Sequence, residues 1–178
     1  MPVCGSGTRR ELMADLTAAL APGSPERLFA VVRLHGFGAV IRRGGEAAAT
    51  TLLAEAERSL LDGVDESGRC YQPRFDEWCI LFDSDVETAI RHLDAVTAAI
   101  DEVGETCGIF SEAGVAILPQ EARDPLGALE RADRRVAPAG PEGGRELGRT
   151  LRRARRGDGD HANVVELFPN GPPAVVHG

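Results

Sequence analysis

Apolar and polar residues recur along the chain with two different periods as far as about residue 136. The helical period predicts four helices, at residues 8–20, 45–61, 85–103 and 124–136. Short apolar runs rich in β-branched residues predict strands at residues 28–37, 70–71, 77–82 and 108–118. The second and third strands are expected to form a hairpin that bends near Arg74 and Phe75, because Pro73 interrupts the apolar pattern there.

Residues with known positional preferences mark the ends of these helices. Thr8 and Glu11 have the spacing of a capping box, and Asp85 is placed to cap the third helix. Asp124 followed by Pro125 is typical of a helix start. The order helix, strand, helix, hairpin, helix, strand, helix predicts an α+β fold, in which helices pack on a mixed sheet.

The length of 178 residues is that of one domain with tails. We expect the domain to span residues 1–140. Residues 141–178 are rich in Arg, Gly and Pro and predict a flexible C-terminal tail. Its apolar end, VVELFPNGPPAVV, could add an edge strand, dock on a partner or trail in solvent.

Charge and composition exclude several classes of protein. A net charge of -8 disfavours a nucleic-acid binder, because neutralising phosphates needs a basic face. No apolar run reaches the ~18 residues of a membrane span and no signal sequence precedes the domain, so we expect a cytoplasmic protein. All 20 basic residues are arginine, which is typical of a GC-rich, here bacterial, genome. The four cysteines are scattered and indicate neither a zinc site nor a disulfide framework.

Several sequence pieces resemble the GGDEF family, the diguanylate cyclases that condense two GTP molecules into cyclic di-GMP, over about residues 8–140. RFDEW (74–78) lies at the hairpin bend, where the family has its signature. Phe37 matches the Phe of the family motif Asp-x-Asp-x-Phe-Lys, and Gly45 matches the first Gly of the segment that follows. GVAILP (114–119) and ALERADRR (128–135) resemble a later strand and the closing helix. The resemblance implies a nucleotidyl cyclase-like α/β sandwich of ferredoxin-like type, with a mixed, mainly antiparallel sheet flanked by helices.

The resemblance does not extend to the metal ligands of the first strand. In the family, two metal ions are bound by the first Asp of the first strand, by the next backbone carbonyl and by the first acidic residue of the signature. Arg33 and Leu34 stand at the first two positions, and His35 replaces the second Asp of the motif. A guanidinium cannot coordinate Mg²⁺ and stays charged at any relevant pH. We therefore predict no metal and no other cofactor.

The nucleotide-binding positions have changed as well. Arg74 and Phe75 replace the two signature glycines, whose missing Cβ atoms allow the nucleotide to approach the backbone. Asp76 and Glu77 are retained, and Trp78 replaces Phe. The positions that select guanine or contact phosphate in the family are occupied by Ile41, Thr50, Gly38 and Gly140. The resemblance thus implies a degenerate site without catalytic residues.

Each of these residues also has a plain structural interpretation. Asp76 and Glu77 are a remnant of a metal site or, more simply, a solvated or salt-bridged pair. We predict that Arg33 pairs with one of them as a counter-charge. Arg74 and Phe75 form either a partner-binding tip or, for Phe75, a local packing contact. His35 is interpreted as a structural histidine.

The leading hypothesis is therefore a catalytically inactive GGDEF-like domain that regulates bacterial signalling through a protein partner or as a homodimer. An alternative is a domain that senses a nucleotide or cyclic di-GMP without turnover. A third hypothesis is residual diguanylate cyclase activity that uses Asp76 and Glu77.

Overall fold

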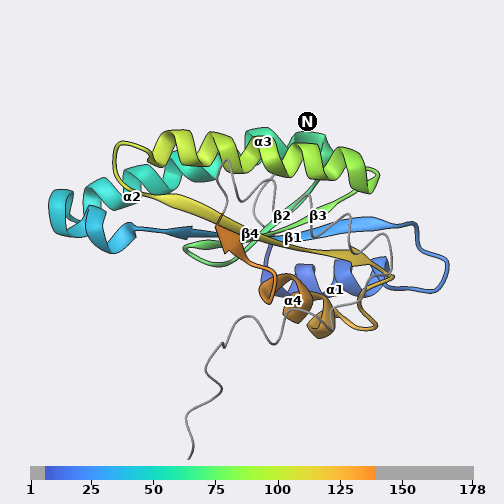
Figure 1. Ribbon diagram of the computed structural model, residues 1–178. Coiled ribbons are helices and arrows are strands. Elements are labelled where there is room, and N and C mark those ends of the chain that lie inside the picture. Colours follow the sequence, from blue (N-terminus) through green and yellow to red (C-terminus); the bar gives the residue numbers. More distant parts are fainter. Residues whose placement is uncertain (1–6, 139–178) are drawn as a thin grey trace, which may run out of the picture. The chain divides into compact units, whose positions relative to one another are not determined.

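The structure is a computed structural model that describes residues 7–138, and it confirms the predicted α+β fold. Its sheet has the strand order β2-β3-β1-β4-β5, with every neighbouring pair antiparallel (Figure 1). A parallel bridge between Gly7 and Tyr71 adds to the outer edge of β2. The strands are β1 (Arg27–His35), β2 (Gly68–Arg74), β3 (Glu77–Phe82), β4 (Phe110–Leu118) and β5 (Ala137–Pro138).

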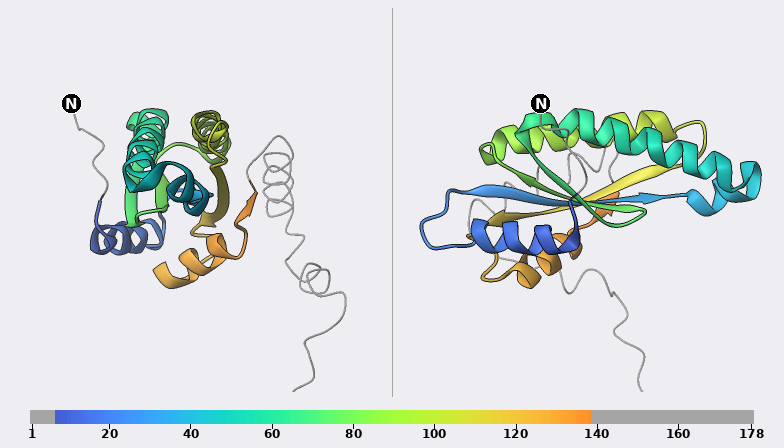
Figure 2. Two further views of the ribbon diagram at one scale, coloured as in Figure 1. Left: turned by 90° about the vertical axis from the view of Figure 1, so that its left-hand side faces the viewer. Right: turned by 180° about the vertical axis from the view of Figure 1, so that it is seen from behind.

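Helices cover both faces of the sheet. One face carries α2 and α3, which lie side by side, and the other carries α1 and α4 (Figure 2). The bounds are α1 (Arg9–Ala19), α2 (Phe37–Val64), α3 (Val86–Gly104) and α4 (Pro125–Asp133), and a short 3₁₀ turn, η1 (Asp65–Ser67), follows α2. The capping box of Thr8 and Glu11 and the caps of Asp85 and Asp124 form as predicted. No helix within residues 7–138 is long and apolar enough to cross a membrane.

The central strand β1 is buried on both of its faces. Phe29 and Val31 pack into one apolar cluster with Leu12 and Leu16 of α1. Because side chains alternate along a strand, Leu28, Ala30 and Val32 point to the opposite face, under α2 and α3. Arg33 follows Val31 on the α1 and α4 face, at the point where this cluster ends. The charged side chain of Arg33 therefore lies at the edge of the apolar core.

The structure corrects the predicted start of the second helix. The sequence pattern predicts a strand as far as Phe37 and a helix from Gly45, but β1 ends at His35 and α2 begins at Phe37. Gly36 adopts a φ of 99°, which lets the chain turn directly from the strand into the helix. At Gly45, with a φ of 77°, the helix is kinked. Its first part buries little besides Val40, so the periodic signal there is weak.

The hairpin contains an irregularity beside its tip. Tyr71 pairs with Cys79 and Arg74 pairs with Glu77, so two residues of β2 lie opposite one residue of β3. The predicted interruption at Pro73 is therefore a bulge within a longer strand, where the missing N–H of proline is tolerated. The predicted domain boundary at residue 140, and the predictions for Gly140 and the tail 141–178, lie outside the described residues.

A partly buried ion pair between Arg135 and Glu121 holds the segment after α4 against the sheet. Arg135 donates to both carboxylate oxygens of Glu121, at 2.7 Å and 2.8 Å, and also to the carbonyl oxygen of Val115 at 3.2 Å. Glu121 accepts a further hydrogen bond from the N–H of Ile117 at 2.8 Å. Burial raises the pKa of Glu121, but the hydrogen bonds from Arg135 and Ile117 outweigh it and hold the pKa below its ordinary value.

We predict that Glu121→Gln lowers the free energy of unfolding at pH 7 by about 2 kcal/mol, because the substitution removes a buried charged pair. A carboxylate whose pKa is depressed in the fold stabilises it above the unfolded pKa and loses this effect as the pH falls through the folded pKa. The wild type should therefore lose stability as the pH falls below about 4.5, and Glu121→Gln should lose less. Urea denaturation at neutral and acid pH measures both.

Glu130→Gln is the matched control. It breaks an exposed i,i+4 pair with Arg134 and should change the free energy of unfolding by less than about 0.5 kcal/mol. Equal losses for the two variants at pH 7 would contradict the assigned role of Glu121.

Candidate functional site

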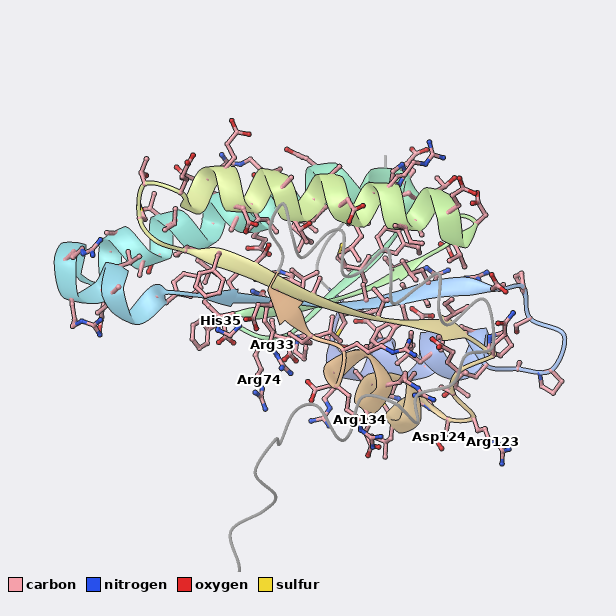
Figure 3. The ribbon with its side chains drawn as sticks, in the orientation of Figure 1. Arg33, His35, Arg74, Arg123, Asp124 and Arg134 are labelled. Carbon is pink, nitrogen blue, oxygen red and sulfur yellow. The ribbon has the colours of Figure 1, made fainter. Side chains whose placement is uncertain are left out.

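Arg33 lies near the end of β1 (Figure 3), where two carboxylates accept hydrogen bonds from its guanidinium. Its Nε donates to Glu77 Oε2 at 2.7 Å, and its Nη2 donates to Asp133 at the end of α4. Burial lowers the pKa of Arg33, but the bonds to Glu77 and Asp133 outweigh this effect and raise it. The predicted pairing of Arg33 with a signature carboxylate is thus confirmed, with Glu77 as the partner and Asp133 as an unpredicted second one.

The hairpin tip presents Arg74 and Phe75 to solvent. Phe75 is 64% exposed, and its ring meets that of Phe37 edge to face, with centroids 6.1 Å apart. Gln72 donates to the carbonyl oxygen of Phe75 at 3.3 Å and so braces the turn. The ring thus makes the predicted local packing contact and leaves most of its surface exposed, and the partner-binding interpretation stays a prediction.

Asp76 is connected to β1 through its backbone. The N–H of Leu34 donates to the carbonyl oxygen of Asp76 at 2.9 Å, which extends the pairing of β1 with β3 toward the tip. The side chain of Leu34 is buried under α2 and α3. Asp76 is thus fixed beside Arg33 and Glu77, at the place that the resemblance assigns to the metal-binding carboxylate.

His35 has neighbours on β4. Its ring stacks on that of Phe110, with centroids 5.3 Å apart, and its Nε2 lies 2.7 Å from Glu112 Oε2. The Nε2 atom makes no well-aligned hydrogen bond there, so the ring is held by its stacking on Phe110 and its close contact with Glu112. These packed surroundings fit the interpretation of His35 as a structural histidine.

Three further predicted positions, Gly38, Ile41 and Thr50, lie along α2. Gly38 and Ile41 are exposed in the first part of the helix, before the kink. Thr50 lies beyond the kink, and its hydroxyl donates to the carbonyl oxygen of Glu46 at 2.9 Å. The structure therefore brings together Arg33, Asp76 and Glu77, and within residues 7–138 no hydrogen bond or ion pair joins Ile41 or Thr50 to them.

Trp78 is the buried member of the signature. It is fully buried and pairs with Val32 on the face covered by α2 and α3. Its indole Nε1 has no hydrogen-bond partner among residues 7–138. A buried N–H without a partner costs about 1–3 kcal/mol, so part of what this large ring gains by packing is lost.

We predict that Trp78→Phe changes the free energy of unfolding by less than about 1 kcal/mol, because removing the unpaired N–H offsets the smaller ring. Trp78→Ala should cost about 4 kcal/mol through the cavity it leaves. Thermal and urea denaturation of both variants checks this, and a loss in Trp78→Phe close to that in Trp78→Ala would contradict it.

The residues at this site do not fit the metal ions of the family. Mg²⁺ needs oxygen ligands in near-octahedral geometry. Here the guanidinium of Arg33 stands at the position that the resemblance assigns to a ligand, and Glu77 and Asp133 already accept its hydrogen bonds. Of the carboxylates of Asp76, Glu77 and Asp133, only that of Asp76 makes no hydrogen bond or ion pair within the described part of the chain. One carboxylate beside a fixed cation is a poor ligand set for a divalent ion.

The sequence analysis missed three residues of this region. Asp133 belongs to the ALERADRR segment and carries the second contact to Arg33, while Phe110 and Glu112 lie beside His35. The register of β1 with β4, which pairs Arg33 with Glu112 and His35 with Phe110, brings two of them into place. A strand alignment made from the sequence could have found these two, but Asp133 depends on how α4 packs.

Comparison with known structures gives the fold class. The GGDEF domain of YfiN (TpbB) from Pseudomonas aeruginosa matches with a TM-score of 0.65 and 21% identity, over 77% of this chain and 95% of that one. The active GGEEF domain of a diguanylate cyclase from Vibrio cholerae matches with a TM-score of 0.61 and 20% identity, over 74% and 87%. The P. aeruginosa diguanylate cyclase SiaD, solved with its activator SiaC, matches at 0.62 and 18%, over 76% and 55%.

The chain therefore has the fold of GGDEF domains, and the predicted resemblance is confirmed at that level. In sequence, no protein-family model and no curated protein matches the chain.

Proposed function

We propose that this chain is a GGDEF-type domain of cyclic di-GMP signalling that does not synthesise cyclic di-GMP and acts by contact with another protein. The observation that carries the proposal is the clamp of Arg33 between Glu77 and Asp133, at the position where the family has a metal-binding Asp. The fold supports the family context, and the changed site supports the loss of catalysis.

The charge of residue 33 has the wrong sign for binding a metal ion. Replacing Asp by Arg changes the local charge by two units, from attraction to repulsion of a divalent cation. At 4 Å and an effective dielectric constant of 20, a guanidinium and a divalent ion repel each other by about 8 kcal/mol. The clamp prevents the guanidinium from swinging away, since both of its partners are held by secondary structure.

The hairpin tip supports contact with a protein in place of a nucleotide. Arg74 and Phe75 place side chains where the family has glycines, and both are exposed. Arginine and aromatic residues are the types that most often anchor protein interfaces. SiaD, a diguanylate cyclase with a similar fold, was solved in complex with its activator protein, so a GGDEF protein can assemble with a regulator. For this chain, the partner is another protein or a second copy.

The test is incubation of the full chain with GTP and either Mg²⁺ or Mn²⁺, followed by chromatographic detection of cyclic di-GMP and pyrophosphate. An active diguanylate cyclase assayed in parallel is the control. We expect neither product from this chain, and calorimetry with GTP and cyclic di-GMP should show no binding in the micromolar range, which corresponds to about -8 kcal/mol. Robust synthesis of cyclic di-GMP would overturn the proposal, and tight nucleotide binding without turnover would favour the sensing alternative.

A further inference from the structure

A pocket of about 290 Å³ opens beside the hairpin, on the face of the sheet that carries α1 and α4. Its floor is apolar and is formed by Leu12, Val31, Pro73 and Leu129. Arg9, at the start of α1, and Arg74, at the hairpin tip, stand at its rim and are both exposed. The pocket therefore combines an apolar surface with two exposed arginines, beside the charged residues Arg33, Glu77, Glu130 and Asp133.

Some of the charged residues that line this pocket have ion-pair partners, and others have none within the described residues. Arg33, Glu77 and Asp133, which also line it, hold one another in the clamp, and Glu130 pairs with Arg134 at 3.1 Å. Arg9 and Arg74 have no ion-pair partner among residues 7–138. Two unpaired cations thus flank one opening in a chain whose net charge is -8.

We propose that this pocket binds an acidic segment of a partner protein, in which a carboxylate lies next to an aliphatic side chain. The inference rests on the proposed function, because it names the kind of partner that the inactive domain contacts. The aliphatic side chain enters the apolar floor, where its burial removes apolar surface from water. The carboxylate meets the guanidinium groups of Arg9 and Arg74, which are suited to paired hydrogen bonds with a carboxylate.

The position of the charge favours an extended segment. Arg9 and Arg74 come from different elements, α1 and the hairpin, and both line the pocket, so a segment that contacts both spans the distance from helix to hairpin. Figure 3 shows Arg74 projecting from the sheet on the α4 side, clear of the helix. The neighbouring ring of Phe75 is 64% exposed and continues the contact surface along the hairpin tip. A segment that leaves the pocket in that direction meets an aromatic anchor of the type found at interface hot spots.

The test is an NMR titration of the ¹⁵N-labelled full chain with the peptide acetyl-Leu-Glu-Leu-amide, compared with acetyl-Leu-Gln-Leu-amide. We expect the Glu peptide to shift the amide signals of Leu12, Arg74 and Leu129, with a dissociation constant of about 1 mM. The Gln peptide should bind about tenfold more weakly, because it lacks the charge-assisted hydrogen bonds. Added salt should weaken only the binding of the Glu peptide.

Variants assign the binding to the two arginines. Arg9→Gln with Arg74→Gln should reduce the affinity for the Glu peptide about tenfold. Arg123→Gln is the matched control, because Arg123 is an exposed arginine beside the helix cap Asp124, at the far end of α4 from Arg74 (Figure 3). That variant should bind as the wild type does.

The proposal is overturned if the two peptides bind equally, if the shifts lie away from the pocket, or if no shift occurs at several times the expected dissociation constant. The proposed function is tested separately by the GTP assay. A chain that makes no cyclic di-GMP and ignores the Glu peptide would retain the proposed function and lose this inference.

Discussion

Replacing Gly114 by alanine is expected to destabilise the domain by about 3 kcal/mol, which is large for the addition of one methyl group. A Cβ atom at Gly114 in β4 would lie 2.1 Å from the carbonyl oxygen of Ala132 and 2.6 Å from the nitrogen of Val136. Both contacts are with backbone, so no side chain can rotate away. The chain from the end of α4 toward β5 would have to move off the sheet.

Gly127→Ala, in α4, is the control. A Cβ atom there would have no neighbour nearer than 3.6 Å, and alanine favours a helix over glycine by about 1 kcal/mol. Thermal and urea denaturation should therefore show Gly114→Ala destabilised and Gly127→Ala unchanged or slightly stabilised. Wild-type stability in Gly114→Ala would show that α4 does not pack on β4 as the structure has it.

Replacing Arg33 by methionine is expected to lower the free energy of unfolding by about 2 to 3 kcal/mol. Methionine keeps much of the length of the side chain but leaves Glu77 and Asp133 without their cation. The side chain of Glu77 is only 13% exposed, so its unpaired charge would be poorly solvated. The side chain of Asp133 is 52% exposed and should contribute much less.

A double-mutant cycle separates these contributions. Adding Glu77→Gln to Arg33→Met removes the stranded charge and should recover part of the lost stability, whereas Asp133→Asn should recover little. If Arg33→Met alone leaves the stability unchanged, Arg33 is not clamped, and the argument against metal binding loses its basis.

Much of the fold follows from the sequence because its signals are local and agree with one another. The clear apolar stripe of α3 and the caps of Thr8, Asp85 and Asp124 predict helices that the structure contains. The segment after β1 was predicted wrongly, since Gly36 and Gly45 adopt conformations that leave no periodic signal. In this segment the positive φ angles of the glycines determine where the chain turns, and the spacing of apolar residues does not predict them.

Only those contacts of the candidate site that join residues on paired strands could be predicted from the sequence. Arg33 and Glu77 face each other in the β1–β3 register, so their ion pair could be anticipated from the alignment of a hairpin with the first strand. Asp133 and Arg9 reach the same region from helices, and their positions depend on how α1 and α4 pack. The pocket that these residues line could therefore not be predicted from the sequence.

The central claim is that the clamped guanidinium of Arg33 excludes a metal–nucleotide complex from the hairpin. NMR of the ¹⁵N-labelled full chain with Mn²⁺ and GTP tests it directly, because paramagnetic Mn²⁺ broadens the signals of nearby amides. We predict that the amide signals of Leu34 and Asp76 keep their intensity relative to that of Arg123. Selective loss of the Leu34 and Asp76 signals, only when both Mn²⁺ and GTP are present, would contradict the account.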